Sequence, residues 1–160
     1  KKLSYAQVFF EYSDIDILNS DIHDLKEITN SLGLNSDYEW IEDIQMLLFV
    51  HLIEPKLKEI PICLIYDFPK QQAALAEIHG PIAHRFEMYM NGTEIANGYQ
   101  EIQSANDYRD RFNTELNKRK ALSKPFEFLD HGFLDDLEEG IPKCSGVAIG
   151  IERLYSLLSL

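Results

Sequence analysis

The sequence predicts an α+β domain in which helices flank an antiparallel sheet. Strand-like segments cluster in the middle of the chain, where the dipeptide Asn91-Gly92 marks a tight hairpin. Helix start signals stand on both sides of that cluster. The chain has 160 residues, of which 45% are apolar, so it is long enough for one packed core. No repeat, low-complexity tract or linker divides it.

Three helices are expected, each after a capping box in which two side chains three residues apart satisfy free backbone N–H groups. Gly33 is expected to end the first helix, and Pro55 is expected to block extension of the second. The second helix is apolar on several sides and is expected in the core, whereas the third is charged and is expected on the surface. The boxes pair Asp21 with Asp24, Ser36 with Glu39 and Ser104 with Asp107, before helices over about residues 22–32, 39–53 and 105–122.

The strands are predicted from short apolar or alternating runs that are bounded by turn residues. Asn91-Gly92 is the strongest turn signal, because a type I′ turn needs positive φ at both central residues. A last strand is expected to lead through Gly150 into a terminal helix, with Arg153 in its first turn. The strands are expected over about residues 62–68, 85–90, 93–102 and 146–151.

Charge and composition argue against several classes of function. The chain has 15 Lys+Arg against 27 Asp+Glu, a net charge of −12, which is a poor match for a nucleic-acid backbone. Its longest uncharged apolar run, Met46 to Val50, is too short to span a membrane, and no signal peptide opens the chain. Cys63 and Cys144 lie far apart, and the scattered histidines show no zinc spacing. We therefore expect a cytoplasmic protein without a zinc site.

The predicted hairpin brings two carboxylates together. A two-residue turn would pair Glu87 with Ala96 and place Glu87, Tyr89, Glu94 and Ala96 on one face. Glu87 and Glu94 would repel each other unless a cation lay between them, and Mg²⁺ shared with phosphate oxygens is the natural candidate. The alternative is that both carboxylates point to solvent on an edge ribbon.

The second hairpin strand carries Asn97, Tyr99 and Glu101 on the opposite face by its period of two. All of them would face one cleft only if the strand broke this period near Ala96 to Gly98, where a glycine favours a bulge. An amide, an aromatic ring and a carboxylate in line would suit a small ligand with an amine. Strict alternation, with one set facing the cleft, is the alternative.

The segment from Cys144 to Leu154 predicts a strand that runs into a helix. Gly150 would allow a ligand to approach the backbone, and Arg153 beside a helix N-terminus would favour an anion or a nucleotide. The segment matches neither a Walker A loop nor a dinucleotide-binding glycine motif. The alternative is that Arg153 is an ordinary surface residue.

Together these motifs resemble the catalytic domain of class II aminoacyl-tRNA synthetases of the lysyl type. Arg85-Phe86-Glu87, Asn91-Gly92 and the run E-I-A-N-G-Y-Q-E over residues 94–101 resemble the lysyl signature, and residues 144–158 resemble motif 3. The resemblance implies that residues 1–160 are the C-terminal portion of such a catalytic domain. Motif 1, which forms the class II dimer, and the motif 2 arginine are absent and are expected before Lys1.

Within this family the chain is most similar to the free-standing paralogues that ligate beta-lysine to elongation factor P. The segments Ser4 to Phe9 and Cys144-Ser145-Gly146 carry this likeness. Lysyl-tRNA synthetases typically have Thr-Ala-Gly at the second of these segments and Gly in place of Ala148. The methyl group of Ala148 would reshape the amino-acid pocket in favour of beta-lysine, and neutral drift is the alternative.

The resemblance implies a role for each matched residue, with ATP and Mg²⁺ as cofactors. The substrate carboxylate would attack ATP to give an aminoacyl-adenylate, and the acyl group would pass to a lysine of elongation factor P. The implied roles are Glu87 and Glu94 for Mg²⁺; Glu94, Ile95, Gly150 and Arg153 for ATP, with Arg153 catalytic; and Asn97, Tyr99, Glu101 and Ala148 for the amino acid, with Glu101 receiving its side-chain amine.

Because motifs 1 and 2 are missing, we expect the isolated chain to lack adenylation activity and the full-length protein to be a homodimer. One alternative is a lysyl-tRNA synthetase fragment that charges tRNA. The other is a non-catalytic, synthetase-like binding protein, against which the intact Glu87, Glu94, Glu101 and Arg153 argue.

Overall fold

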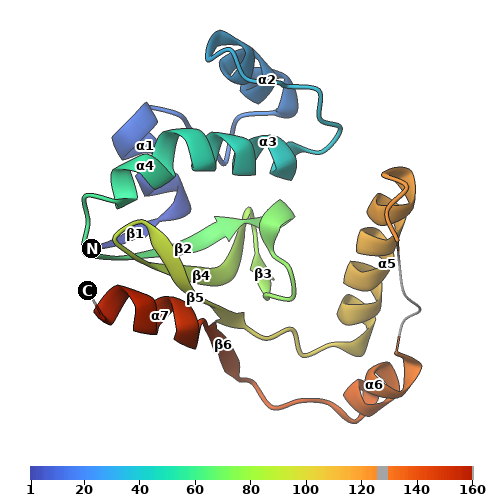
Figure 1. Cartoon of the computed structure of the whole chain (residues 1–160). Coiled ribbons are helices and arrows are strands. Elements are labelled where there is room, and N and C mark those ends of the chain that lie inside the picture. The colour runs from blue at the N-terminus through green and yellow to red at the C-terminus, as the bar shows by residue number, and fades with distance from the viewer. Residues whose placement is uncertain (126–129, 160) are drawn as a thin grey trace.

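The structure is a computed structural model that describes residues 1–125 and 130–159 (Figure 1). A mixed sheet forms its centre, with strands β1 (Lys2–Ser4), β2 (Ile62–Pro69), β3 (Ile78–His79), β4 (Ile82–Met90), β5 (Thr93–Gln100) and β6 (Ser145–Ile149). The strand order is β1-β2-β4-β5-β6, and β3 pairs with β4. β1 runs parallel to β2, and the other pairs are antiparallel, so the expected antiparallel sheet gains one parallel edge strand.

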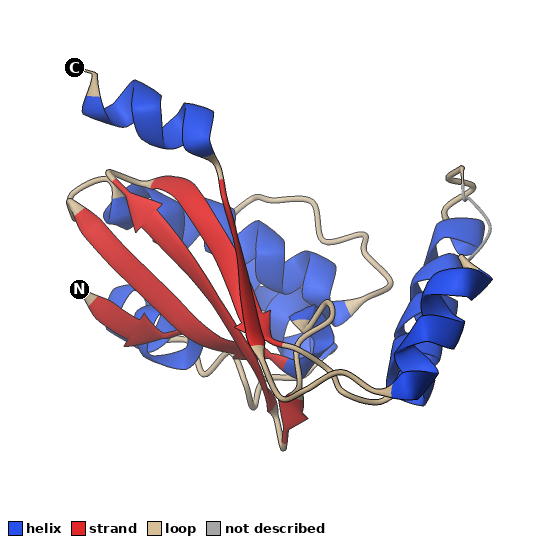
Figure 2. Cartoon of the chain, turned by 90° about the horizontal axis from the view of Figure 1, so that it is seen from below, coloured by secondary structure: helices blue, strands red, loops and turns tan. Residues whose placement is uncertain are grey.

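The helices cover one face of the sheet and extend beyond it. They are α1 (Tyr5–Ser13), α2 (Ile22–Ser31), α3 (Ile41–Leu48), α4 (Glu54–Leu57), α5 (Ala105–Ala121), α6 (His131–Asp136) and α7 (Ile151–Leu158), with a π-helical turn η1 (Phe49–Ile53) and 3₁₀ turns η2 (Lys70–Gln72) and η3 (Leu137–Glu139). Figure 1 shows α1, α3 and α4 over the sheet and α5 standing to one side. Figure 2 shows the strands side by side, with α7 leading from one edge to the C-terminus. Within the described ranges, no helix is both long and apolar enough to cross a membrane.

Two of the three predicted helix starts are confirmed. Asp21 accepts hydrogen bonds from the His23 and Asp24 N–H groups in a complete capping box, and Gly33 follows the helix with φ at 70°. Ser104 accepts from the Asp107 N–H at 3.3 Å, and α5 begins at the next residue.

The box predicted at Ser36 is wrong. Its hydroxyl donates to Asn30 Oδ1 at 2.6 Å, so the end of α2 competes for the capping side chain. The next helix, α3, begins at Ile41 after Trp40, which makes no side-chain capping hydrogen bond.

The prediction that Pro55 blocks the second helix is also wrong. The chain continues from α3 through the π-helical turn η1 into α4. Pro55 lies at the start of α4, directly after the π-helical turn, in which the Glu54 N–H bonds to the Phe49 carbonyl five residues back. The helix therefore continues past the proline by way of the π-helical turn.

The main core lies between the sheet and α1, α3 and η1. The ring of Tyr5 packs against Phe9, Phe49 and Phe68, with ring centroids 4.8–5.4 Å apart. Each such side chain contributes roughly 1.5–3 kcal/mol by burial. The sequence predictions did not include α1, although Ser4 and Gln7 form a complete capping box at its start. This packing fixes α3 and η1 opposite strands β4 and β5, where the candidate site lies.

Candidate functional site

The β4–β5 hairpin begins as predicted. Asn91 and Gly92 have φ values of 48° and 77°, which confirms a turn with positive φ at both central residues. Met90 pairs with Thr93, and Tyr89 pairs with Glu94, as expected.

Beyond that point the register shifts by one residue. Met88 pairs with Ala96, and Glu87 pairs with Asn97, so the expected pairing of Glu87 with Ala96 is wrong. The extra residue on β5 is Ile95, which makes the irregularity a β-bulge.

The bulge decides which side chains share a face. Because one residue is inserted, Asn97 and Tyr99 lie on the same face as Glu87, and Ala96 turns to the other face. The strand therefore breaks its period, and strict alternation is wrong, but the break falls at Ile95, one residue before the expected range of Ala96 to Gly98. Gly98 allows close packing instead, because a Cβ atom there would lie 2.5 Å from the Gly146 carbonyl oxygen and 2.8 Å from the Phe86 ring.

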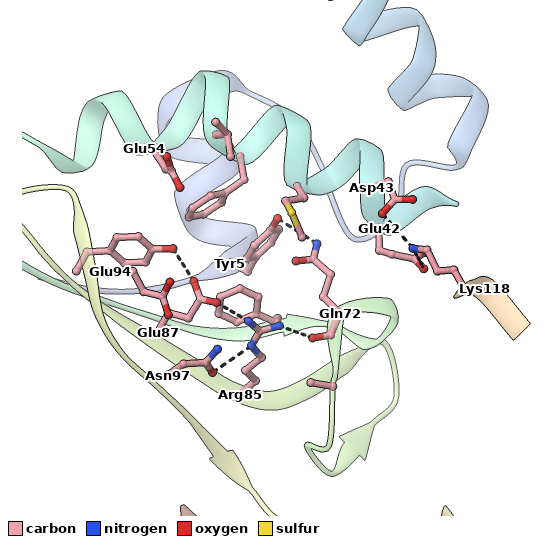
Figure 3. Close-up of a pocket in the computed structure, with 16 residues that line it drawn as sticks. Tyr5, Glu42, Asp43, Glu54, Gln72, Arg85, Glu87, Glu94, Asn97 and Lys118 are labelled. Carbon is pink, nitrogen blue, oxygen red and sulfur yellow. Dashed lines mark hydrogen bonds and ion pairs between the residues drawn. The ribbon is translucent and has the colours of Figure 1, made fainter. Parts of the chain in front are cut away.

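A cavity of about 460 Å³ opens between this face and the helices (Figure 3). The sheet contributes six lining residues, which are Phe68, Arg85, Glu87, Tyr89, Glu94 and Asn97. The helical side contributes apolar residues of α3 and η1, three carboxylates and one lysine, namely Met46, Phe49, Val50, Glu42, Asp43, Glu54 and Lys118.

Glu87 is held on both carboxylate oxygens. Glu87 is 8% exposed. Arg85 Nη2 donates to its Oε1 at 2.5 Å, and the Tyr89 hydroxyl donates to its Oε2 at 2.5 Å. Burial and the neighbouring Glu87 charge raise the pKa of Tyr89, so its hydroxyl stays protonated and able to donate.

Glu94 is less well neutralised than Glu87. Burial and the charge of Glu87 raise its pKa, although Arg153 and Arg85 oppose this shift. Arg153 Nη1 lies 3.7 Å from the Glu94 carboxylate and donates to the Glu94 carbonyl at 2.9 Å. The cavity therefore holds negative charge that its own cations balance only in part.

Sequence reasoning missed Glu54, a third carboxylate at the same cavity. It begins α4 directly after the π-helical turn, and burial followed by repulsion from Glu87 raises its pKa. The available signal was a lone carboxylate after an apolar helical run.

The chemistry of the site fits a hard divalent cation shared with a ligand. The described residues contain no group of three or more His, Cys, Asp and Glu side chains placed to hold a metal by themselves. Mg²⁺ is usually held by one or two carboxylates and completes its shell with water and phosphate oxygens. Glu94 carries incompletely balanced charge, and each Glu87 oxygen keeps a second lone pair. Glu94 and Glu87 could therefore hold such an ion between them.

A second group of predicted residues lies further along the same sheet face, outside the lining of this cavity. Ala148 of β6 pairs with Asn97, and Gly146 pairs with Tyr99. Glu101 follows β5, and the Tyr108 hydroxyl lies 3.4 Å from its carboxylate.

Glycine leaves room for the Glu101 carboxylate. A Cβ atom on Gly146 would lie 2.7 Å from Glu101 Oε1. Burial and the Glu101 charge raise the pKa of Tyr108 to about 12. The structure thus places the Asn97 amide, the Tyr99 ring and the Glu101 carboxylate along one face, as the period of two predicted, and the bulge puts that face on the side of Glu87.

Gly150 and Arg153 lie where the sequence predicted. Gly150 is the N-cap of α7, and its N–H donates to the Ile95 carbonyl at 2.9 Å. Arg153 lies in the first turn of α7 with an exposed side chain and binds β5 at the bulge. The motif 3 segment and the bulge are therefore one connected unit.

Comparison with known proteins gives the family of the chain. The model of the family described as tRNA synthetases class II (D, K and N) matches residues 3–159. An elongation factor P--(R)-beta-lysine ligase from Proteus mirabilis is 42% identical over 163 aligned residues, and one from Photorhabdus laumondii is 38% identical. Each alignment covers 98% of this chain and 50% of the relative, so the chain spans about half the length of these relatives. The chain belongs to the class II tRNA synthetase family that comprises the D, K and N enzymes.

Proposed function

We propose that the protein carrying this chain is a ligase that activates (R)-beta-lysine or lysine with ATP and transfers it to a lysine of elongation factor P. The observation that carries this proposal is the bulge at Ile95, which brings Glu87, Glu94 and Asn97 onto one face at the cavity. The names of the two relatives support the amino acid and the acceptor.

The proposed reaction has two steps. A carboxylate oxygen of the amino acid attacks the α-phosphorus of ATP, the bond to pyrophosphate breaks, and an aminoacyl-adenylate forms. The acceptor amine then attacks the acyl carbon, the bond to AMP breaks, and the amine loses a proton as the amide forms. Such chemistry depends mainly on positioning and on neutralising phosphate charge.

The residues of this chain would bind and orient the reactants. Glu87 and Glu94 would hold Mg²⁺, which when bound would neutralise phosphate charge. Arg153 and Gly150 at the start of α7, with Ile95 beside them, would contact ATP.

The amino acid would lie along the outer part of the sheet face. Glu101 would accept the side-chain ammonium of the substrate, and Asn97 and Tyr99 would line the pocket. Ala148 would narrow the pocket opposite Asn97, because its methyl group stands on the same face. We expect Ala148→Gly to shift the preference of the enzyme from beta-lysine toward alpha-lysine.

The test is pyrophosphate exchange by the full-length gene product with each lysine isomer, followed by mass measurement of elongation factor P after the reaction. We expect faster exchange with beta-lysine and a mass gain of one lysyl group on elongation factor P. The isolated 160 residues are expected to show no exchange, since they lack the motif 2 arginine.

The family match also includes lysyl-tRNA synthetases, which makes tRNA charging the second candidate. A clear preference for alpha-lysine together with aminoacylation of tRNA would support that candidate and contradict the ligase proposal. A full-length protein without exchange activity would instead be the non-catalytic binding protein.

A further inference from the structure

Arg85 stands at the centre of the sheet wall of the cavity. Its side chain is 17% exposed, and its guanidinium lies 4.6 Å from the centre of the Phe68 ring. Each of its three nitrogens donates to a different residue: Nη1 to the Gln72 carbonyl at 2.7 Å, Nη2 to Glu87 at 2.5 Å and Nε to Asn97 Oδ1 at 3.4 Å. The guanidinium is therefore committed to the protein on all three nitrogens.

The anchor of Arg85 is itself tied to the core. The Gln72 side chain donates to the Tyr5 hydroxyl at 3.2 Å and to Gln45 Oε1 at 3.0 Å. Tyr5 of α1 and Gln45 of α3 are both buried. The position of Arg85 is therefore determined by the packed interior, and not by the ligand.

Arg85 fixes the orientation of Asn97. A guanidinium can only donate hydrogen bonds, so the amide oxygen of Asn97 must turn toward Arg85. The Asn97 amide nitrogen cannot accept from Arg85 and is left to donate to another group, while the oxygen makes the bond that Figure 3 marks. Asn97 therefore presents a donor to a ligand, which suits a carboxylate or phosphate oxygen.

Arg85 also fixes the plane of Glu87. A buried carboxylate is costly unless it is paired, and Arg85 and Tyr89 hold its two oxygens from different sides. One cation thereby orients two of the side chains that line the cavity, Glu87 on β4 and Asn97 on β5.

We propose that Arg85 is a positioning residue, which keeps the Glu87 carboxylate and the Asn97 amide in the orientations that the reaction needs. This inference rests on the proposed function. Lysine cannot replace Arg85, because a single ammonium does not reproduce a planar fork that reaches Gln72, Glu87 and Asn97 together.

The first test measures pyrophosphate exchange in the full-length gene product. Arg85→Ala is expected to lower the turnover number by roughly 10²-fold, as small misplacements of reacting groups do. Added guanidinium ion should restore part of this loss, and ammonium ion at the same concentration should not. The matched control is Arg119→Ala, since Arg119 is an exposed arginine of α5 and should leave exchange unchanged.

A double-mutant cycle separates positioning from a general loss of structure. If Arg85 acts through Asn97, the loss in Arg85→Ala combined with Asn97→Ala should be clearly smaller than the product of the two single losses. Independent, multiplying effects, or a loss that follows the unfolded fraction, would overturn the proposal. If Arg85→Ala does not fold, Arg85→Lys replaces it in the cycle.

A readout without catalysis keeps this inference apart from the proposed function. The side-chain amide resonances of Asn97, identified by their loss in Asn97→Ala, should shift in Arg85→Lys and not in Arg119→Ala. If wild-type protein shows no exchange but these resonances shift, the proposed function fails and the positioning role stands. Unchanged resonances in Arg85→Lys would contradict the positioning role.

Discussion

The two walls of the cavity are built in different ways. On the sheet wall, Glu87 and Tyr89 are buried and the Arg85 side chain is 17% exposed. Arg85 and Tyr89 each donate to the Glu87 carboxylate from alternate positions of one strand. The α5 wall borders the cavity at its edge, where Lys118 of α5 meets Glu42 and Asp43 of α3, and Tyr108 is the buried residue among the 17 of α5. The Glu87 carboxylate is therefore held from two sides by its own strand, whereas one lysine holds α5 to α3.

Lys118 joins α5 to the carboxylates of α3. Its Nζ donates to Glu42 and Asp43 at 3.0 Å each and lies 4.8 Å from the centre of the Trp40 ring. Figure 3 shows this lysine reaching the cavity edge from α5. The difference teaches that the candidate reacting groups of the sheet wall are held by a network within one strand, whereas α5 is held at the cavity edge by ion pairs of one lysine.

The largest effect is expected from breaking the sheet wall with Glu87→Ala. This variant leaves the Arg85 charge buried without its carboxylate, which should lower the free energy of unfolding by about 3–5 kcal/mol. Urea unfolding of the full-length gene product measures this. Glu115→Ala, an exposed change on α5, is the control and should stay within about 0.5 kcal/mol of wild type. A loss below about 1 kcal/mol for Glu87→Ala would show that this network does not hold the sheet wall.

Tyr89→Phe is expected to have a smaller effect on the same wall. It removes one hydrogen bond to the Glu87 carboxylate and should cost about 1.5–3 kcal/mol in unfolding free energy. Tyr155→Phe is the matched control, because Tyr155 is 71% exposed. Equal effects of the two tyrosine changes would contradict the difference in burial on which this expectation depends.

On the α5 wall, Lys118→Met should cost only about 1 kcal/mol. Burial lowers the pKa of Lys118, but hydrogen bonds to Asp43 and Glu42 outweigh it, so the folded-state pKa lies above the unfolded one. The contribution of Lys118 is therefore complete below its unfolded pKa and is lost as the pH rises through the folded pKa. Thermal unfolding of both forms should differ at pH 8 and converge at strongly alkaline pH. A cost as large as that of Glu87→Ala would remove the distinction between the walls.

The smallest effect is expected at the edge of the cavity, in Glu94→Gln. The folded-state pKa of Glu94 is raised, so its ionisation opposes folding: stability falls as the pH rises from the ordinary carboxylate range through the raised pKa. The Gln variant should show a flatter stability profile between about pH 4 and pH 7, measured by urea unfolding. A steeper profile in the variant would reverse the sign of this argument. The variant should also bind Mg²⁺ with ATP more weakly in calorimetric titration.

The sequence was informative where neighbouring residues determine the conformation. The hairpin at Asn91-Gly92, the start of α2 at Asp21 and the Gly150 junction follow from turn and capping chemistry and were predicted. The capping box of Ser4 and Gln7 was equally local and could have revealed α1.

Other features depend on partners that are distant in the sequence. The bulge lies at Ile95, before the expected range of Ala96 to Gly98. At the bulge, the Gly150 N–H donates to the Ile95 carbonyl and the Arg153 guanidinium donates to the Glu94 carbonyl. Ser36 failed as a cap because Asn30 binds its hydroxyl. No local pattern contains this information. The sequence therefore predicted a hairpin that carries these side chains, but not the strand register that decides which of them share a face.

The bulge at Ile95 makes the length of β5 more important than the identity of many of its side chains. Because side chains alternate between the two faces of a strand, the one extra residue at Ile95 decides whether Asn97 and Tyr99 face the cavity side or the back of the sheet. A substitution at one of these positions removes one contact. Loss of a single residue near position 95 would turn the whole set away together, while leaving every one of those side chains in the chain.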